Sequence, residues 1–219
     1  ALAGIAARWQ GIIVESGAEA ILPYSSAGVQ GLIQLHSLDR RLFGSMGCSN
    51  LDRNICGAVA SAGLSTTIGT GAGIDPEQIV HSRFIVLWGT NTIVTNLHYW
   101  PLVRGARRRG ATLVVIDPVR TRTAEEADWF LQVQPGSDAT LALAMMHVLI
   151  RDNLLDHDYI AKYTLGFTEL KARAAEWTPQ RASDICGIPV ADIEALAKAY
   201  GSTKKAAIRL NYGMQRHGG

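Results

Sequence analysis

Apolar residues are spaced in two ways along this chain. In some segments they recur with the period of a helix, and in others they form the continuous runs that are typical of buried strands. Apolar residues recur at helical intervals over residues 2–15, and Gly17 then ends the predicted helix. The apolar run 20–24 predicts a short strand, and a helix carrying leucines at helical spacing is expected over 32–42. The beginning of the chain therefore predicts a β-loop-α unit.

Further along, continuous apolar runs predict the strands of a buried parallel sheet. They cover residues 84–88, 112–116, 129–133 and 206–210. The first two runs are separated by about the ~30 residues of a right-handed βαβ unit, so these strands should be neighbours. Helices are predicted over 139–150, 156–163, 167–175 and 190–200. The sequence therefore predicts an α/β fold, a Rossmann-like parallel sheet with helices on both faces.

Composition excludes several classes of protein. With 47% hydrophobic and 18% charged residues, the 219-residue chain fits a globular protein rather than a disordered one. The formal net charge of +2 gives no electrostatic reason to expect nucleic acid or an anionic membrane surface as a partner. No apolar run approaches the ~20 residues that a membrane-spanning helix needs, so we expect no direct insertion into a bilayer.

The number and spacing of the cysteines limit the kinds of metal site that this chain can form by itself. The chain has three cysteines, Cys48, Cys56 and Cys186, and no Cys-x-x-Cys pair. This pattern argues against a disulfide framework, a structural zinc site or an iron–sulfur cluster within the chain. Cys48 and Cys186 are expected in the core, because free cysteine usually packs as a small hydrophobe.

Three polar loops follow predicted strands, and open parallel sheets bind ligands beyond the carboxyl ends of their strands. The loops cover 89–92, 117–123 and 135–138. Glycine lets a phosphate approach the backbone, while Asp117 and Asp138 offer carboxylates that accept from a ribose or a guanine edge. Such residues are equally common as turn formers and helix caps, so each loop alone is as consistent with a structural role. Together the loops predict a nucleotide site.

Known phosphate-binding signatures narrow the class of nucleotide. The sequence has no Gly-x-Gly-x-x-Gly after a strand and no Gly-x-x-x-x-Gly-Lys-Ser/Thr. A nicotinamide cofactor and ATP or GTP hydrolysis are therefore disfavoured.

Four separated motifs point to a family. They are Leu87-Trp88-Gly89-Thr90-Asn91, then Val115-Ile116-Asp117-Pro118-Val119-Arg120-Thr121-Arg122-Thr123-Ala124, then Gln134-Pro135-Gly136-Ser137-Asp138-Ala139, and finally Gly213-Met214-Gln215-Arg216-His217. In order and spacing this set resembles the molybdopterin oxidoreductases of the dimethyl sulfoxide reductase and formate dehydrogenase type. Any one motif would be weak evidence, and the agreement of the four makes the resemblance specific.

The resemblance implies a bis(molybdopterin guanine dinucleotide) cofactor with molybdenum or tungsten. In this family the two aspartate motifs hold the guanosine end. The residues expected to hold the nucleotide are Trp88, Gly89, Asn91, Asp117, Thr121, Thr123, Gly136 and Asp138, with Met214 and Gln215 nearer the pterin. Ser137 stands where the family usually has threonine, and Arg120 lies one place from the usual arginine, so the role of Arg120 stays open.

The same resemblance gives Cys56 a candidate catalytic role. The segment Asn54-Ile55-Cys56-Gly57-Ala58 looks like the place where these enzymes carry a Cys, selenocysteine, Ser or Asp ligand to the metal. A thiolate is a soft anionic donor that suits molybdenum or tungsten. Cys56 is therefore expected to be the metal ligand, and the alternative is an ordinary buried cysteine.

A divided fold is also implied by the resemblance. Residues 1–55 and about 206–219 would form one discontinuous α/β domain, and 56–205 the inserted Rossmann-like domain that binds the pterin-guanine dinucleotide. Both ends of the chain look cut. The iron–sulfur cluster motif and a further carboxyl-terminal domain are expected outside these residues, and the chain alone should be inactive.

The activity implied by the family is two-electron redox chemistry on a small substrate, with a carrier protein or subunit exchanging the electrons. Two alternatives stay open: a non-catalytic relative in an electron-transfer complex, and an ordinary nucleotide-binding α/β enzyme. The substrate and the choice between molybdenum and tungsten do not follow from the sequence. The compartment is open as well, with the cytoplasm slightly favoured over the periplasm.

Overall fold

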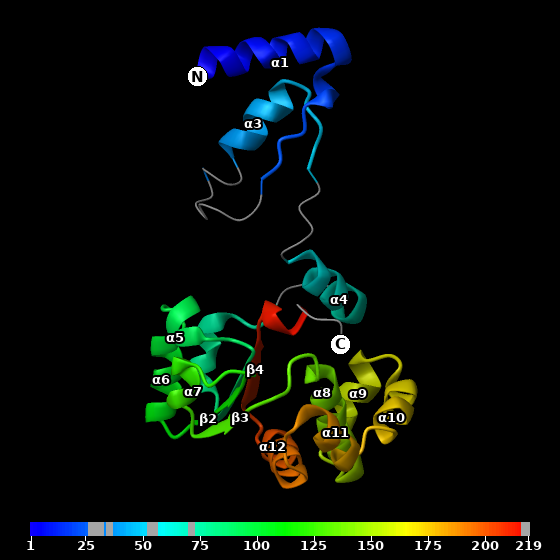
Figure 1. Cartoon of the computed structure of the whole chain (residues 1–219). Coiled ribbons are helices and arrows are strands. Elements are labelled where there is room, and N and C mark those ends of the chain that lie inside the picture. The colour runs from blue at the N-terminus through cyan, green and yellow to red at the C-terminus, as the bar shows by residue number, and fades with distance from the viewer. Residues whose placement is uncertain (26–32, 34–36, 52–56, 70–72, 216–219) are drawn as a thin grey trace. The chain divides into compact units, whose positions relative to one another are not determined.

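The protein divides into two compact units, Ala1–Gly63 and Leu64–Gly219. The structure is a computed structural model that describes residues 1–25, 33, 37–51, 57–69 and 73–215. Figure 1 shows helices in the first unit, and a sheet with covering helices in the second. The helix α4 (Ala58–Ile68) spans the boundary between the two units.

Before α4, the described part of the smaller unit contains two helices and a 3-10 turn. They are α1 (Leu2–Ser16), η1 (Ala18–Ala20) and α3 (Leu38–Ser45). Gly17 ends α1 with a φ of 83°, a backbone conformation that a residue with a side chain rarely adopts. The rings of Trp9 and Phe43 lie 5.5 Å apart between centroids and join α1 to α3. The predicted first helix is therefore confirmed.

The strand expected over residues 20–24 is absent from the described structure. Residues Ala18–Ala20 form η1, and residues 21–25 have no regular secondary structure. The carbonyl of Ile21 accepts one backbone hydrogen bond, from Ser49 at 3.1 Å, and Pro23 has no N–H to donate to a partner strand. The expectation of a β-loop-α unit at this place is wrong.

A four-stranded parallel sheet forms the centre of the larger unit. Its strands are β1 (Phe84–Trp88), β2 (Thr112–Ile116), β3 (Trp129–Leu131) and β4 (Ala206–Leu210), and their order across the sheet is β3-β2-β1-β4. The predicted strands are confirmed, although β3 ends two residues earlier than expected. The expected pairing of the first two is confirmed as well.

Helices connect and cover these strands. They are η2 (Pro76–His81), α5 (Thr92–Thr95), α6 (Trp100–Arg108), α7 (Arg122–Glu125), α8 (Asp138–Arg151), α9 (His157–Tyr163), α10 (Phe167–Ala175), α11 (Pro179–Cys186), α12 (Val190–Ser202) and η3 (Tyr212–Gln215). In the described part of the chain, no helix is both long enough and apolar enough to cross a membrane.

The sheet has an apolar core on each of its faces. On one face, Phe84, Val86 and Trp88 of β1 pack with buried residues of α8, α11 and α12. On the other face, Ile85 and Leu87 pack with buried residues of η2 and α6. Figure 1 shows these two groups of helices on opposite sides of the sheet. The predicted Rossmann-like sheet with helices on both faces is therefore confirmed.

The position of β4 differs from the domain boundary that we expected. Residues 206–219 were expected to rejoin the domain of residues 1–55, but β4 pairs in parallel with β1, with Phe84 opposite Ala206 and Trp88 opposite Leu210. Strand 206–210 therefore belongs to the sheet of the larger unit. The chain reaches it from β3 through α8–α12, so the strand order reverses direction between β1 and β4.

Candidate functional site

The candidate loops meet at one edge of the sheet, because parallel strands all end on the same side. Backbone hydrogen bonds continue past the strand ends and hold these loops together. The N–H of Gly89 donates to the carbonyl of Ile116 at 2.8 Å, and the N–H of Asp117 donates to the carbonyl of Leu131 at 3.2 Å. The geometric condition for a shared ligand site, three neighbouring turns at the strand tips, is met.

The loop after β1 turns sharply and buries its hydroxyl groups. Gly89 has a φ of 62°, in the left-handed region that favours glycine. Thr90 and Thr92 are 2% and 1% exposed, and their hydroxyl oxygens lie 3.4 Å apart. The candidate residues inferred from the sequence do not include these two threonines, although Thr90 stands inside the first motif. Their buried hydroxyls fix the shape of the loop around Asn91.

Thr123 connects the loop after β1 to the loop after β2. Its hydroxyl donates to Oδ1 of Asn91 at 2.9 Å and accepts from the N–H of Ile93 at 3.0 Å. Thr121 caps α7, because its hydroxyl accepts from the N–H of Ala124 at 3.3 Å. Since Asn91 uses its oxygen on Thr123, its amide NH₂ is the group that faces other partners. Thr121 and Thr123 thus act through the shape of the loops.

Trp88 and Asp138 form a buried hydrogen bond that links β1 to the third loop. The indole Nε1 of Trp88 donates to Oδ1 of Asp138 at 2.6 Å, and the two residues are 3% and 8% exposed. Asp138 is the first residue of α8, and Ser137 precedes it as the cap position. Trp88 orients the carboxylate that a ligand would meet. It is a positioning residue.

Asp117 is a second buried carboxylate at this edge, and it is 8% exposed. Its Oδ1 accepts from the N–H of Val119 at 2.9 Å. Burial raises the pKa of Asp117 above its ordinary value, and the negative charge of Asp138 raises it further, while the hydrogen bond from Val119 lowers it. Two carboxylates that affect each other electrostatically therefore stand after β2 and β3.

The third loop and the turn after β4 complete the edge. Gly136 has a φ of 85°, and the hydroxyl of Ser137 donates to the carbonyl of Gln134 at 2.7 Å. A Cβ added at Gly213 would lie 3.8 Å from the carbonyl oxygen of Gly89, so the turn after β4 lies against the loop after β1. Doubly wound sheets bind dinucleotides in the crevice at such a reversal of strand order. Met214 and Gln215 lie in η3, which follows β4.

The metal ligand inferred from sequence lies outside the described residues, because residues 52–56 include Cys56. Cys48 and Cys186 are buried free thiols, as expected of core residues. Within the described ranges, no group of three or more His, Cys, Asp or Glu side chains is arranged to hold a metal ion. The expectation that Cys56 is a metal ligand therefore stays a prediction.

The described donor set fits a guanine nucleotide. Two buried carboxylates, Asp117 and Asp138, can accept from a ribose hydroxyl and from the N–H groups of a guanine edge. Glycines with positive φ, Gly89 and Gly136, allow a ligand to approach the backbone. The arrangement suits binding and orientation of a nucleotide, and the described loops contain no nucleophile paired with a general base.

Comparisons with known proteins agree on one family. A family model described as molybdopterin oxidoreductase matches residues 1–217. The chain is 43% identical to the probable oxidoreductase YoaE of Bacillus subtilis over 97% of this chain and 31% of that protein. It is 32% identical to the dimethyl sulfoxide reductase DmsA of Escherichia coli, over 97% of this chain and 30% of that protein.

A formate dehydrogenase and a solved structure extend this comparison. Formate dehydrogenase H of Escherichia coli is 29% identical over 98% of this chain and 30% of that protein. The acetylene hydratase from Pelobacter acetylenicus has a TM-score of 0.65 and 24% identity, over 96% of this chain and 29% of that one, and supports the fold alone. The chain spans about three tenths of the length of these proteins.

The bond between Trp88 and Asp138 predicts a specific loss of stability. The substitution Trp88→Phe removes the indole N–H that donates to the buried carboxylate of Asp138. The loss of this hydrogen bond should lower the free energy of unfolding by about 1–3 kcal/mol, in addition to the cost of the smaller ring. Urea unfolding measures this quantity. Trp129→Phe is the matched control, because Trp129 is half-buried against the same core. An equal loss in both variants would contradict the assigned role.

The raised pKa of Asp117 predicts that Asp117→Asn increases the stability of the protein by an amount that depends on pH. Above the ordinary aspartate pKa of about 4, the unfolded chain releases its proton while the folded protein retains it, so the wild type loses stability as the pH rises through this window. Asparagine has no such proton. The Asp117→Asn variant should therefore be more stable than the wild type at pH 7, with a smaller difference at pH 3. Unfolding curves at both values test this, and a pH-independent difference would refute it.

Proposed function

Because the chain belongs to the molybdopterin oxidoreductase family, we propose that it contributes to a molybdenum or tungsten oxidoreductase by binding the guanosine end of bis(molybdopterin guanine dinucleotide). The observation that carries this proposal is the common edge of the sheet at which Gly89, Asp117 and Asp138 follow three neighbouring strands. A nucleotide at this edge would meet carboxylates and backbone donors together.

Each loop has a distinct task in this proposal. Asp138, oriented by Trp88, accepts hydrogen bonds from the N–H groups of the guanine edge. Asp117 accepts from a ribose hydroxyl. Gly89 and Gly136 leave room for the ligand beside the backbone, and the amide of Asn91 donates to it. Met214 and Gln215, after β4, would lie nearer the pterin.

The redox chemistry belongs to the part of the cofactor beyond these loops. When bound, the metal centre supplies two-electron transfer to or from a small substrate. Cys56 is the proposed thiolate ligand, since a soft anionic donor suits molybdenum or tungsten. The electrons would pass to a carrier protein or subunit, and an iron–sulfur cluster bound outside these residues would connect the two.

The matched proteins act on different substrates by name, including formate and dimethyl sulfoxide. These names support a small substrate for the full-length protein without selecting one. The described residues hold the nucleotide rather than the reacting atoms, so the substrate is decided elsewhere in the protein.

The proposal predicts that Asp138→Asn lowers the cofactor content of the purified full-length protein. The loss of a charge-assisted hydrogen bond is worth about 1.5–3 kcal/mol, or roughly ten- to a hundredfold in affinity. Guanine nucleotide released on denaturation and bound molybdenum or tungsten should fall together. Cys56→Ala should retain the guanine nucleotide and lose activity.

The control for this experiment is Asp158→Asn, which removes an exposed carboxylate on α9. It should keep wild-type cofactor content. A wild-type protein that holds neither metal nor guanine nucleotide would overturn the proposal and favour a non-catalytic relative. Unchanged content in Asp138→Asn would show that the guanosine binds elsewhere.

A further inference from the structure

A dinucleotide tail carries a diphosphate, and the residues assigned to the nucleotide so far contribute no positive charge. Asp117 and Asp138 are carboxylates, and the other candidate residues of these loops are neutral. Two buried carboxylates near a dianionic group are unfavourable unless a cation or directed donors offset them. This inference rests on the proposed function, and it asks which side chain neutralises the diphosphate.

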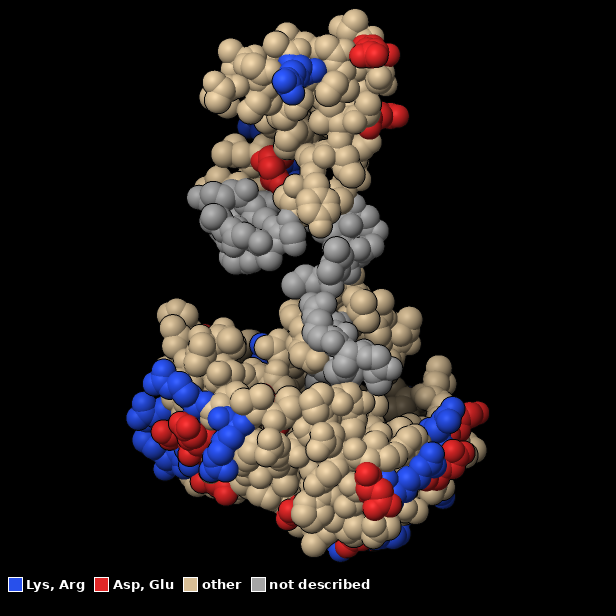
Figure 2. All heavy atoms as spheres, in the orientation of Figure 1, with Lys and Arg blue, Asp and Glu red and all other residues tan. Residues whose placement is uncertain are grey.

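The loop after β2 carries two arginines, Arg120 and Arg122, that have not been assigned to the nucleotide. Arg120 lies over the ring of Phe130, at 5.3 Å from the centroid. Arg107 on α6 forms an ion pair with Asp128 at 2.8 Å. Figure 2 shows the basic side chains on this side of the larger unit interspersed with acidic ones. This surface is a mixed, solvated face.

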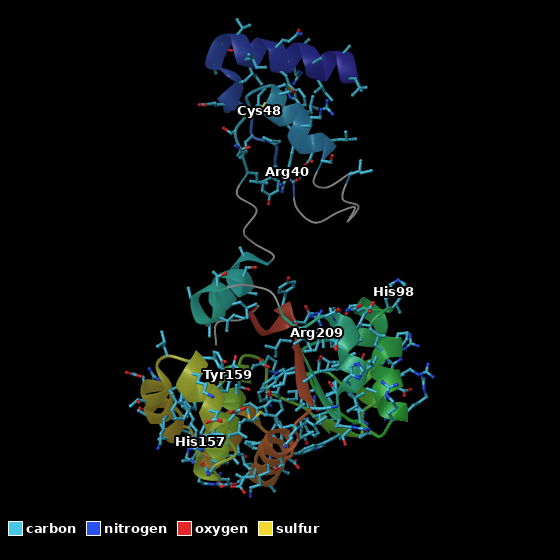
Figure 3. The ribbon with its side chains drawn as sticks, turned by 180° about the vertical axis from the view of Figure 1, so that it is seen from behind. Arg40, Cys48, His98, His157, Tyr159 and Arg209 are labelled. Atoms are coloured by element: carbon cyan, nitrogen blue, oxygen red, sulfur yellow. The ribbon has the colours of Figure 1, made fainter. Side chains whose placement is uncertain are left out.

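Arg209 stands at the crevice itself. It is the penultimate residue of β4 and lies opposite Leu87 of β1, so it comes just before the turn that packs against Gly89. Figure 3 shows Arg209 near the end of β4 that leads into η3. Its side chain is exposed, and its guanidinium carbon lies 5.9 Å from the centre of the Tyr99 ring. Among the described residues, no carboxylate forms an ion pair with it, in contrast to Arg107.

A small cavity of about 120 Å³ lies beside Arg209. Its polar lining comes from Arg209, Tyr99 and Asn96, and no carboxylate is among the described residues around it. Typical ligand pockets measure roughly 300–1,000 Å³, so this cavity is large enough for one small group of a ligand and too small for a nucleoside. A phosphate group fits both its size and its donors.

Tyr99 and Asn96 suit an anion as well. Both belong to the segment that follows the loop after β1, and Tyr99 is 6% exposed. Burial raises the pKa of Tyr99 above its ordinary value, with the charge of Arg209 opposing this, so the phenol keeps its proton at neutral pH. The planar guanidinium presents paired N–H donors that match two phosphate oxygens.

We propose that Arg209, with Tyr99 and Asn96, binds a phosphate of the cofactor's dinucleotide tail at the crevice between β1 and β4. The guanosine then lies over the loops after β1, β2 and β3, and the diphosphate crosses toward β4. Arg209 supplies positive charge on the β4 side of this crevice.

The test uses the full-length protein purified without cofactor, with GDP, guanosine and inorganic phosphate as probes in calorimetric titrations. Arg209→Gln should weaken GDP binding roughly ten- to a hundredfold and leave guanosine binding unchanged. It should also reduce the dependence of GDP affinity on salt, because one screened charge is removed. Arg209→Lys should be intermediate, since a point charge cannot form the paired contact.

Two further variants keep the test decisive. Arg108→Gln removes an exposed charge from α6 and should leave GDP affinity at the wild-type value. Tyr99→Phe keeps the ring and removes the hydroxyl, so it should weaken GDP and not guanosine. If Arg209→Gln unfolds, as circular dichroism would reveal, Arg209→Lys and Tyr99→Phe carry the test.

The outcomes separate this inference from the proposed function. The phosphate role alone would be overturned if Asp138→Asn lost guanosine binding while Arg209→Gln kept the wild-type GDP affinity. If Arg209→Gln unfolds, unchanged GDP affinity in both Arg209→Lys and Tyr99→Phe would overturn it instead. Inorganic phosphate binding that depends on Arg209 without any effect on GDP would mean a separate anion site, which also overturns it. A wild-type protein that binds neither guanosine nor GDP would reject the proposed function.

Discussion

The parallel pairing of β1 with both β2 and β4 is the constraint on which the site depends. Parallel pairing forces every strand to end at the same edge, so residues far apart in the sequence meet there. Because β4 lies on the side of β1 opposite to β2, the strand order also reverses at β1. The loops that carry Gly89, Asp117 and Asp138 therefore lie on one side of that reversal, and the turn with Gly213 lies on the other.

Buried polar groups at this edge destabilise the folded protein unless each of them has a hydrogen-bond partner. The indole of Trp88 supports Asp138, the hydroxyl of Thr123 supports Asn91, and a backbone N–H supports Asp117. Even so, the pKa of Asp117 is raised by burial and by its neighbouring carboxylate. Destabilising groups that are retained at one place are typical of binding sites, where function opposes stability. An anionic ligand at this edge would need the positive charge that Arg209 provides at β4.

Much of the fold follows from the sequence because β1 and β2 are continuous, largely buried apolar runs bounded by glycine and polar loops. The run 84–88, for example, is buried at every position and ends at Gly89. The same reasoning fails for the run 20–24, which forms no strand and in which only Ile21 is buried, since a short apolar run does not by itself specify a strand. The helix α11 was not predicted, although Thr178 and Pro179 at its start are a typical cap and first residue.

The sequence could indicate the candidate residues of the site, but it could not indicate the contacts between them. The motifs indicated Trp88 and Asp138 separately, and the hydrogen bond between them depends on strands and loops that only the fold brings together. The pairing of 206–210 with β1 could not be predicted for the same reason, because an apolar run does not indicate which strand it pairs with.

An experimental structure of the full-length protein with its cofactor tests the central claim most directly. The account predicts a guanine base with its N–H groups about 2.7–3.2 Å from the carboxylate of Asp138, and a sugar hydroxyl at a similar distance from Asp117. A guanosine bound at the opposite edge of the sheet, or out of reach of both carboxylates, would contradict it.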